Sequence, residues 1–211
     1  PTSLLYGQIP HVWVEFDLSA SQSQVPPPSL LFCLDPDYFE RQGCPVSDQY
    51  LTAQVYRQVL DTALEILLDH PLSLKTRKNL LSCFTLLPTD GHIIHVSLML
   101  PRQPPQIKLN IRVPKKQFLA YLKKISWEGS LEAIDAILSR YCPSSQILKL
   151  QLTIEDTVAT KVEFEFHYES SAQADPALQL LLVQLVADGL CMPEKHDALL
   201  TWPGIFRQTF S

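Results

Sequence analysis

Six short segments of the chain predict β-strands. Five of them alternate apolar and polar residues, as strands with one face against a core do, and the sixth, SLLFCL, is an apolar run of strand length between prolines. The segments fall into three pairs. Within the first pair the two segments are joined by the loop SASQSQVPPP, and within the second by the loop PRQPP. Each pair therefore predicts a β-hairpin. The predicted strands are 12–18 with 29–34, 92–100 with 106–113, and 147–154 with 161–168.

After each hairpin the apolar period changes to three or four residues, which predicts amphipathic helices. The longest runs from 48 to 70, with Asp48 as N-cap and Pro71 as the stop, and a second covers 73–87. The second hairpin leads into two further helices, the first ending near Gly129. The remaining predicted helices are 175–189, with Asp175 as cap, Pro176 at its first position and Gly189 after its end, and a short one that begins at PEKHDALL.

This order predicts an α+β fold with about six antiparallel strands in three hairpins, each followed by a helix pair. Alternating strands of this kind bury their apolar residues only if the helices pack on one face of the sheet, which leaves the other face polar. We expect a single domain spanning 1–211, built from three units at approximately 11–88, 89–142 and 143–211. The similarity between the units is one of architecture rather than of side-chain identity.

Two short segments resemble each other: KKISWEG at 123–129 and ALLTWPG at 198–204. Each places a tryptophan and a glycine at the end of a predicted helix. We interpret both as turns anchored by the indole ring, with a structural role.

Composition and charge exclude several classes of function. Lys and Arg total 17 against 22 Asp and Glu, a formal charge of −5, so a nucleic-acid partner is not expected. The most apolar run, 178–186, is far shorter than the ~20 residues of a membrane span, so no membrane partner is expected either. Five scattered cysteines without a CxxC pair indicate neither a disulfide framework nor a zinc site, and fit a reducing cytoplasm. Because the chain opens at Pro1 without a methionine, we expect part of the natural N-terminus to be missing.

Glu163, Glu165 and His167 form the strongest cluster of chemically active residues. Their spacing of two places all three on one face of a strand, with neighbouring Cβ atoms ~7 Å apart. Carboxylates and an imidazole so arranged can share acid–base work or ligate a metal. A solvated outer sheet face has the same pattern, and the catalytic interpretation gains only if Glu15, Asp17 or His95 converges on the cluster.

The remaining candidate ligand-binding residues are Glu15, Asp17 and His95 together with the cations Lys108, Arg112 and Lys149. The three cations predict a patch for a diphosphate or a carboxylate, although ordinary surface lysines and arginines look alike. His92 and His95 are three residues apart in a strand, so we expect them on opposite faces and predict no shared metal ion. There is no glycine-rich phosphate loop, GxSxG or HExxH motif, and we expect neither a cofactor nor a metal.

The segments WVEFDL, GLCMPEKHDALLTWPG and IIHVSLMLPRQPPQIKLNIRVP resemble a group of uncharacterised bacterial proteins. That resemblance implies a bacterial, cytosolic protein of metabolism. The alternation of hairpins and helices also resembles the αββα barrel of the aromatic and peptide prenyltransferases, where polar strand faces line a lumen that holds a prenyl diphosphate. This chain departs from it in having about six predicted strands instead of ten, and in lacking an evident series of Lys, Arg and Tyr.

Two functions remain open from the sequence. The first is a non-catalytic binding or accessory protein that holds a small molecule, a peptide or a second copy of itself, with Trp13 and Arg112 as its dominant contacts. The alternative is an enzyme with a sheet-lined cavity, such as a prenyltransferase-like group transferase, using Glu163, Glu165 and His167.

Overall fold

The computed structural model describes residues 9, 11–17, 25–34, 53–143, 147–165 and 175–201 of the 211-residue chain. These residues fall into two compact units. One contains the described part of 1–129 and 146–165, and the other the described part of 130–145 and 166–211. In none of the described ranges is there a helix long and apolar enough to cross a membrane.

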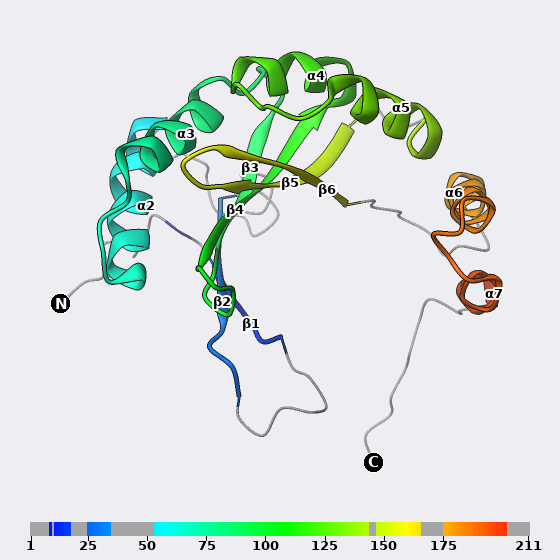
Figure 1. The fold of residues 1–211 in the computed structure, drawn as a ribbon, viewed down its shortest axis with the longest axis horizontal. Coiled ribbons are helices and arrows are strands. Elements are labelled where there is room, and N and C mark those ends of the chain that lie inside the picture. Colours follow the sequence, from blue (N-terminus) through cyan, green and yellow to red (C-terminus); the bar gives the residue numbers. More distant parts are fainter. Residues whose placement is uncertain are drawn as a thin grey trace, which may run out of the picture. The chain divides into compact units, whose positions relative to one another are not determined.

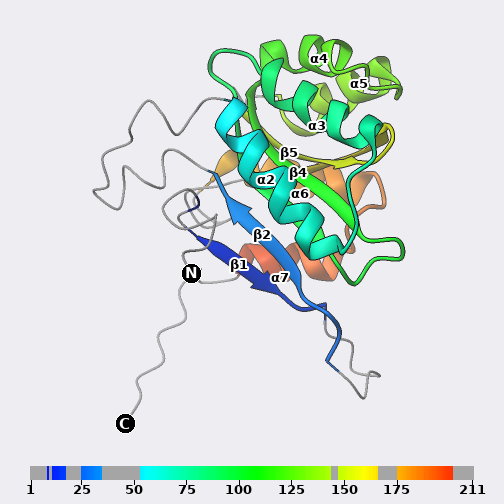
Figure 2. The same cartoon turned by 90° about the vertical axis from the view of Figure 1, so that its left-hand side faces the viewer.

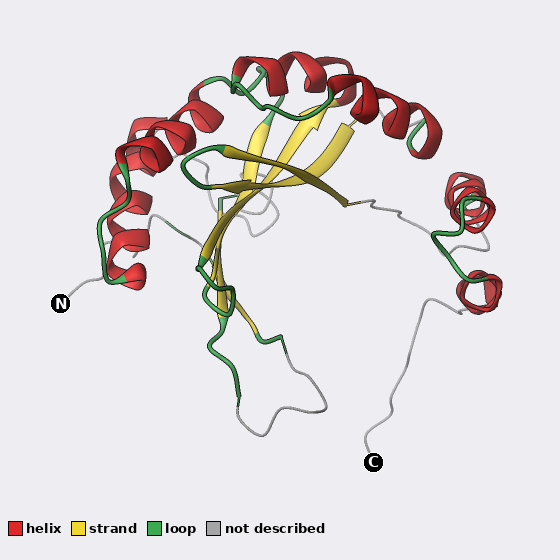
Figure 3. Ribbon diagram, viewed as in Figure 1, coloured by secondary structure: helices red, strands yellow, loops and turns green. Residues whose placement is uncertain are grey.

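The first unit is built on one antiparallel sheet (Figures 1 and 3). Its strands follow one another in sequence order, β1–β2–β3–β4–β5–β6, and hairpins alternate with helical connections. The predicted α+β class and the three hairpins are therefore confirmed. The strands are β1 (Val12–Glu15), β2 (Ser29–Cys33), β3 (His92–Met99), β4 (Gln106–Pro114), β5 (Ile147–Ile154) and β6 (Val158–Glu165).

The core of this unit lies on one face of the central strands. On β4, Ile107, Leu109 and Ile111 are almost completely buried, whereas Lys108 and Asn110 between them are only half-buried. β5 repeats this alternation, and the register pairs apolar residues with apolar ones across the β4–β5 ladder. Cross-strand pairs of this kind stabilise the sheet and the core together, because each side chain packs against its partner on the next strand as well as against the core.

β6 has the orientation that its sequence predicts. Val162 and Phe164 lie on the core face, and the Phe164 ring packs edge-on against Phe118 with ring centroids 6.0 Å apart. Glu163 and Glu165 lie on the opposite face, beside Gln151 and Lys149. The strand starts at Val158, earlier than predicted, because Val158 pairs with Ile154 directly after the turn; 166–168 lie outside the described residues.

Three helices of the first unit lie on the same side of the sheet: α2 (Ala53–Leu68), α3 (Leu74–Thr85) and α4 (Lys115–Lys124) (Figures 1 and 2). α3 contacts β5, and α4 contacts β4 and β5. The N-cap predicted at Asp48 lies outside the described residues.

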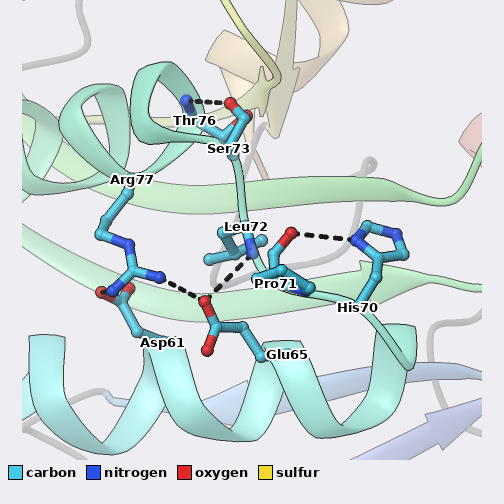
Figure 4. A network of polar contacts seen from close by, with 8 residues as sticks. All are labelled: Asp61, Glu65, His70, Pro71, Leu72, Ser73, Thr76 and Arg77. Atoms are coloured by element: carbon cyan, nitrogen blue, oxygen red, sulfur yellow. Dashed lines mark hydrogen bonds and ion pairs between the residues drawn. The ribbon is translucent and has the colours of Figure 1, made fainter.

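The turn from α2 to α3 is held by a polar network around Glu65 (Figure 4). The Glu65 carboxylate accepts a hydrogen bond from the Leu72 backbone N–H at 3.0 Å and a second from the Arg77 guanidinium. Arg77 also lies 3.7 Å from Asp61, and Ser73 caps α3 by accepting from the Thr76 N–H at 3.0 Å. The two helices are thus joined by groups that neutralise one another.

The start of α3 is also tied to the β5–β6 turn. The Asp156 carboxylate accepts hydrogen bonds from the hydroxyl groups of Ser73 and Thr76, the latter at 3.2 Å. These hydroxyl donors, together with the charge of Lys75, lower the pKa of Asp156. An anion at this position also interacts favourably with the positive end of the helix dipole.

The end of α4 confirms the interpretation of KKISWEG as an indole-anchored turn. Trp127 is buried, and its indole N–H donates to the Ala159 carbonyl of β6 at 2.9 Å. A Cβ on Gly129 would lie 2.2 Å from the indole ring, so only glycine fits there. The matching segment at 198–204 extends beyond Thr201, outside the described residues.

The second unit contains α5 (Leu131–Tyr141), α6 (Pro176–Ala187) and α7 (Pro193–Thr201). The predicted ends of α6 are correct: Asp175 caps it, Pro176 is its first residue and Gly189 adopts a φ of 69°. Asp188 joins α6 to α5, because it accepts 2.7 Å and 2.6 Å hydrogen bonds from Arg140 Nε and the Tyr141 hydroxyl, which hold its pKa well below the usual range.

Neighbouring substitutions on β5 test the face assignment. Leu150→Ala removes fully buried apolar atoms and should lower the free energy of unfolding by about 2–5 kcal/mol. Lys149→Ala, on the half-exposed face, should change it by no more than about 1 kcal/mol. Urea denaturation of the two variants measures both effects. A larger loss for Lys149→Ala than for Leu150→Ala would show that the two faces are assigned the wrong way round.

Candidate functional site

The sheet face opposite α2, α3 and α4 carries the candidate residues that lie in described strands, and we call it the polar face. The strand register places the following residues on the polar face: Trp13 and Glu15 of β1, His95 of β3, Lys108 and Arg112 of β4, Lys149 of β5, and Glu163 and Glu165 of β6. His167 lies outside the described residues.

The prediction that His92 and His95 point to opposite faces is wrong. His92 pairs with Arg112 and His95 with Asn110, two residues that share the polar face of β4. The register shifts between Ile93 and His95, so Ile94 is an extra residue in a β-bulge. A bulge inserts one extra residue into a strand, so that two residues three positions apart point to the same face. No group of three His, Cys, Asp or Glu side chains in the described ranges is arranged to hold a metal.

Glu163, one of the two described candidate catalytic carboxylates, is already engaged by two lysines. Lys108 Nζ lies 2.8 Å from Glu163 Oε2, reaching across β5, and Lys161 Nζ lies 2.6 Å from Oε1. These two hydrogen bonds, that of Lys108 first, lower the pKa of Glu163. A carboxylate held in this way is a weaker base and does not keep a proton to donate near neutral pH.

Glu165, the second carboxylate, accepts a hydrogen bond from the Asn110 side-chain amide at 3.1 Å. Lys149 Nζ lies 3.9 Å from its other oxygen. The polar face between β4 and β6 is thus a ladder of complementary charges. Of the predicted cationic patch, Lys108 and Lys149 face carboxylates, and Arg112 lies directly opposite Lys149 in the β4–β5 register.

Glu15, Asp17 and His95 do not converge on the glutamates. Glu15 lies in β1 and His95 in β3, whereas Glu163 lies in β6, five and three strand positions away at about 4.8 Å per position. Asp17 is 3.5 Å from Arg102 of the β3–β4 loop. The condition that favoured a catalytic cluster is therefore not met by the described residues.

The β1 end of the polar face contains a depression of about 280 Å³. It is lined by Trp13, Val14 and Glu15 of β1, Leu31 of β2 and His95 of β3. Trp13 is 54% exposed, and it lies directly opposite Leu31 in the register. An exposed indole beside a leucine, a carboxylate and an imidazole offers an apolar surface with polar groups at its margin.

Sequence reasoning named Trp13, Glu15 and His95 but did not group the three around one hollow, and it missed Leu31. Leu31 belongs to an apolar run, SLLFC, that has no alternation to show which residues face the core. Only the pairing of β2 with β1 and β3 puts Leu31 beside Trp13. Cys83, by contrast, is a completely buried core residue, and this burial raises the pKa of its thiol to about 12.

Comparison with known proteins returned no match to a family model, a curated protein or a solved structure.

The ion pairs of Glu163 lead to a pH-dependent prediction. Lys108→Met should raise the carboxyl pKa of Glu163 toward its ordinary value, and Lys161→Met should raise it less. Because the folded-state pKa is lowered, Glu163 stabilises the fold at neutral pH, and this contribution disappears as the pH falls through that pKa. Carbon-detected NMR titration measures the pKa, with Lys116→Met of α4 as the matched control. An unchanged Glu163 pKa in Lys108→Met would contradict the assigned pair.

Proposed function

We propose that this protein is a non-catalytic binding protein whose ligand occupies the depression around Trp13. The observation that carries the proposal is the grouping of Trp13, Leu31, Glu15 and His95 around one open hollow. Large aromatic side chains dominate the energy of many binding surfaces, because they bury much area at low entropic cost.

The chemistry of the lining indicates the ligand. A hollow of about 280 Å³ is at the small end of ligand sites, and suits one ring-bearing or branched apolar group. The Trp13 face favours a ring or a cation, and the adjacent Glu15 carboxylate favours a positive charge. A flat apolar group with a nearby ammonium or guanidinium is therefore the ligand chemistry that fits.

The state of the glutamates supports binding over catalysis. A general acid or base needs a pKa near the working pH, whereas Lys108 and Lys161 shift that of Glu163 in the opposite direction. The two carboxylates serve the sheet as charge partners across β4, β5 and β6.

A ligand-detected NMR experiment separates the two roles. Benzylamine, which carries a ring and an ammonium, should give a saturation-transfer signal with the parent protein and lose it with Trp13→Ala. The double variant Glu163→Gln, Glu165→Gln should retain the signal, since neither residue lines the depression.

The opposite pattern would refute the proposal. Loss of the signal in the glutamine variant together with its survival in Trp13→Ala would move the site to the β6 end of the polar face. Thermal melting of each variant confirms that it is folded. Trp13 is exposed, so its replacement should change the stability by no more than about 1 kcal/mol.

A second candidate, a prenyltransferase-like group transferase, is favoured by one observation. At the β4–β6 end of the polar face, Lys108, Arg112, Lys149 and Lys161 outnumber Glu163 and Glu165. This excess of cations on the sheet face opposite α2, α3 and α4 is suited to an anionic ligand.

The second candidate has its own test. Geranyl diphosphate should then bind more tightly than inorganic diphosphate, and Arg112→Gln with Lys149→Gln should weaken both. Isothermal titration calorimetry measures these affinities. Equal, weak binding of both anions that is abolished by salt would leave only non-specific charge attraction.

A further inference from the structure

We infer that the ligand of the Trp13 depression is an extended peptide that adds as a seventh strand to the free edge of β1, placing an apolar side chain at Trp13 and a basic one at Glu15. This inference rests on the proposed function, because it specifies the ligand of the same site. It requires three features: an open backbone edge, a pocket for one side chain, and a charge that selects the next.

The hydrogen-bond pattern of the β1–β2 pair shows which backbone groups of β1 point away from β2. The Cys33 N–H donates to the His11 carbonyl at 2.9 Å, and the register places these residues opposite each other. Hydrogen-bonded and non-hydrogen-bonded pairs alternate in an antiparallel ladder, so Trp13 with Leu31 is the next bonded pair. The N–H and C=O groups of Val12 and Val14 therefore point away from β2, and no described strand pairs with that edge.

The side chains of β1 are as open as its backbone. Val12, Trp13 and Val14 are 46%, 54% and 55% exposed. An apolar edge strand with free backbone groups is a ready template for another strand, and proteins commonly protect such edges with charge. The other edge is protected in this way, because β6 carries Lys161, Glu163 and Glu165. Of the two edges, β1 is the apolar one, and no strand in the described ranges pairs with it.

The register determines which peptide side chains meet the depression. A strand that pairs antiparallel with β1 exchanges hydrogen bonds with Val12 and Val14, and its residue opposite Trp13 points to the polar face. That residue lies beside the depression, where Trp13 and Leu31 supply apolar surface. A phenylalanine or leucine fits this position.

The second recognition position lies opposite Glu15. It is two residues earlier in an antiparallel peptide and also faces the polar side. Asp17 is paired with Arg102, whereas Glu15 has no ion-pair partner among the residues that the structure describes. A lysine or arginine there gains a charge-assisted contact. The partner chemistry is thus a basic residue, any residue, then a large apolar residue, in an extended segment.

N-methylation of a synthetic peptide tests the strand geometry directly. In the capped peptide Thr-Thr-Lys-Val-Phe-Val-Thr, lysine lies opposite Glu15 and phenylalanine opposite Trp13. An N-methyl group on the valine between them removes the hydrogen bond to the Val14 carbonyl and should weaken binding about tenfold or more. The same group on the phenylalanine, whose N–H points away from β1, should leave the affinity within about twofold. Isothermal titration calorimetry measures both peptides.

Amide hydrogen exchange supplies a second readout. Peptide binding should slow the exchange of the Val12 and Val14 amides and leave that of Trp13 nearly unchanged, since the Trp13 amide is already bonded to β2. Glu15→Gln should weaken the lysine peptide, and should not weaken a peptide with glutamine in place of lysine. Glu128→Gln, an exposed site near the end of α4, is the matched control and should change neither affinity.

Four results would overturn the inference. Equal effects of the two N-methyl groups would mean that the peptide does not bind as a strand. A concentration-dependent dimer in sedimentation velocity that protects Val12 and Val14 without peptide would assign the edge to a second copy. Binding of benzylamine at Trp13 without peptide binding would refute the strand partner while leaving the proposed function intact, and loss of both would refute the two together.

Discussion

The strict alternation of side chains in the central β3–β4–β5 ladder is the constraint on which the rest of this structure depends. Leu109, Ile111 and Leu150 are fully buried on one face, so the strand register cannot slip by one residue without exposing all of them. α3 and α4 pack on that face, and Trp127 ties the end of α4 back to β6. Everything that the opposite face presents is positioned by this register.

The polar face is divided by charge. Between β4 and β6 its lysines and glutamates lie within hydrogen-bonding or ion-pairing distance, and their side chains are partly screened by water. Between β1 and β3 the face is less charged and contains the depression around Trp13. Trp13 and Leu31 give this depression an apolar surface with the Glu15 carboxylate beside it, which is why binding is expected there.

The β-bulge at Ile94 has a consequence for that end of the sheet. It brings His92 and His95 to the same face and so places His95 at the depression. A regular strand that kept His92 on the polar face would have turned His95 toward the helices. Bulges are recurrent near functional sites because they redirect a side chain without disturbing the rest of the ladder.

The sequence by itself determined the elements and, where the strands are regular, their faces. Period-two alternation predicted the hairpins and the placement of Glu163 and Glu165 on one face of β6, because alternation is a local property of an extended backbone. Asp175, Pro176 and Gly189 predicted the ends of α6 for the same local reason. Only the tertiary structure decided what the polar residues do. Whether Glu163 is free or held by Lys108, and whether Leu31 meets Trp13, depends on pairing between strands far apart in the chain. A bulge changes the sheet face on which a residue lies, and no local sequence pattern predicts it. The face of His95 was therefore decided by the register of β3 with β4.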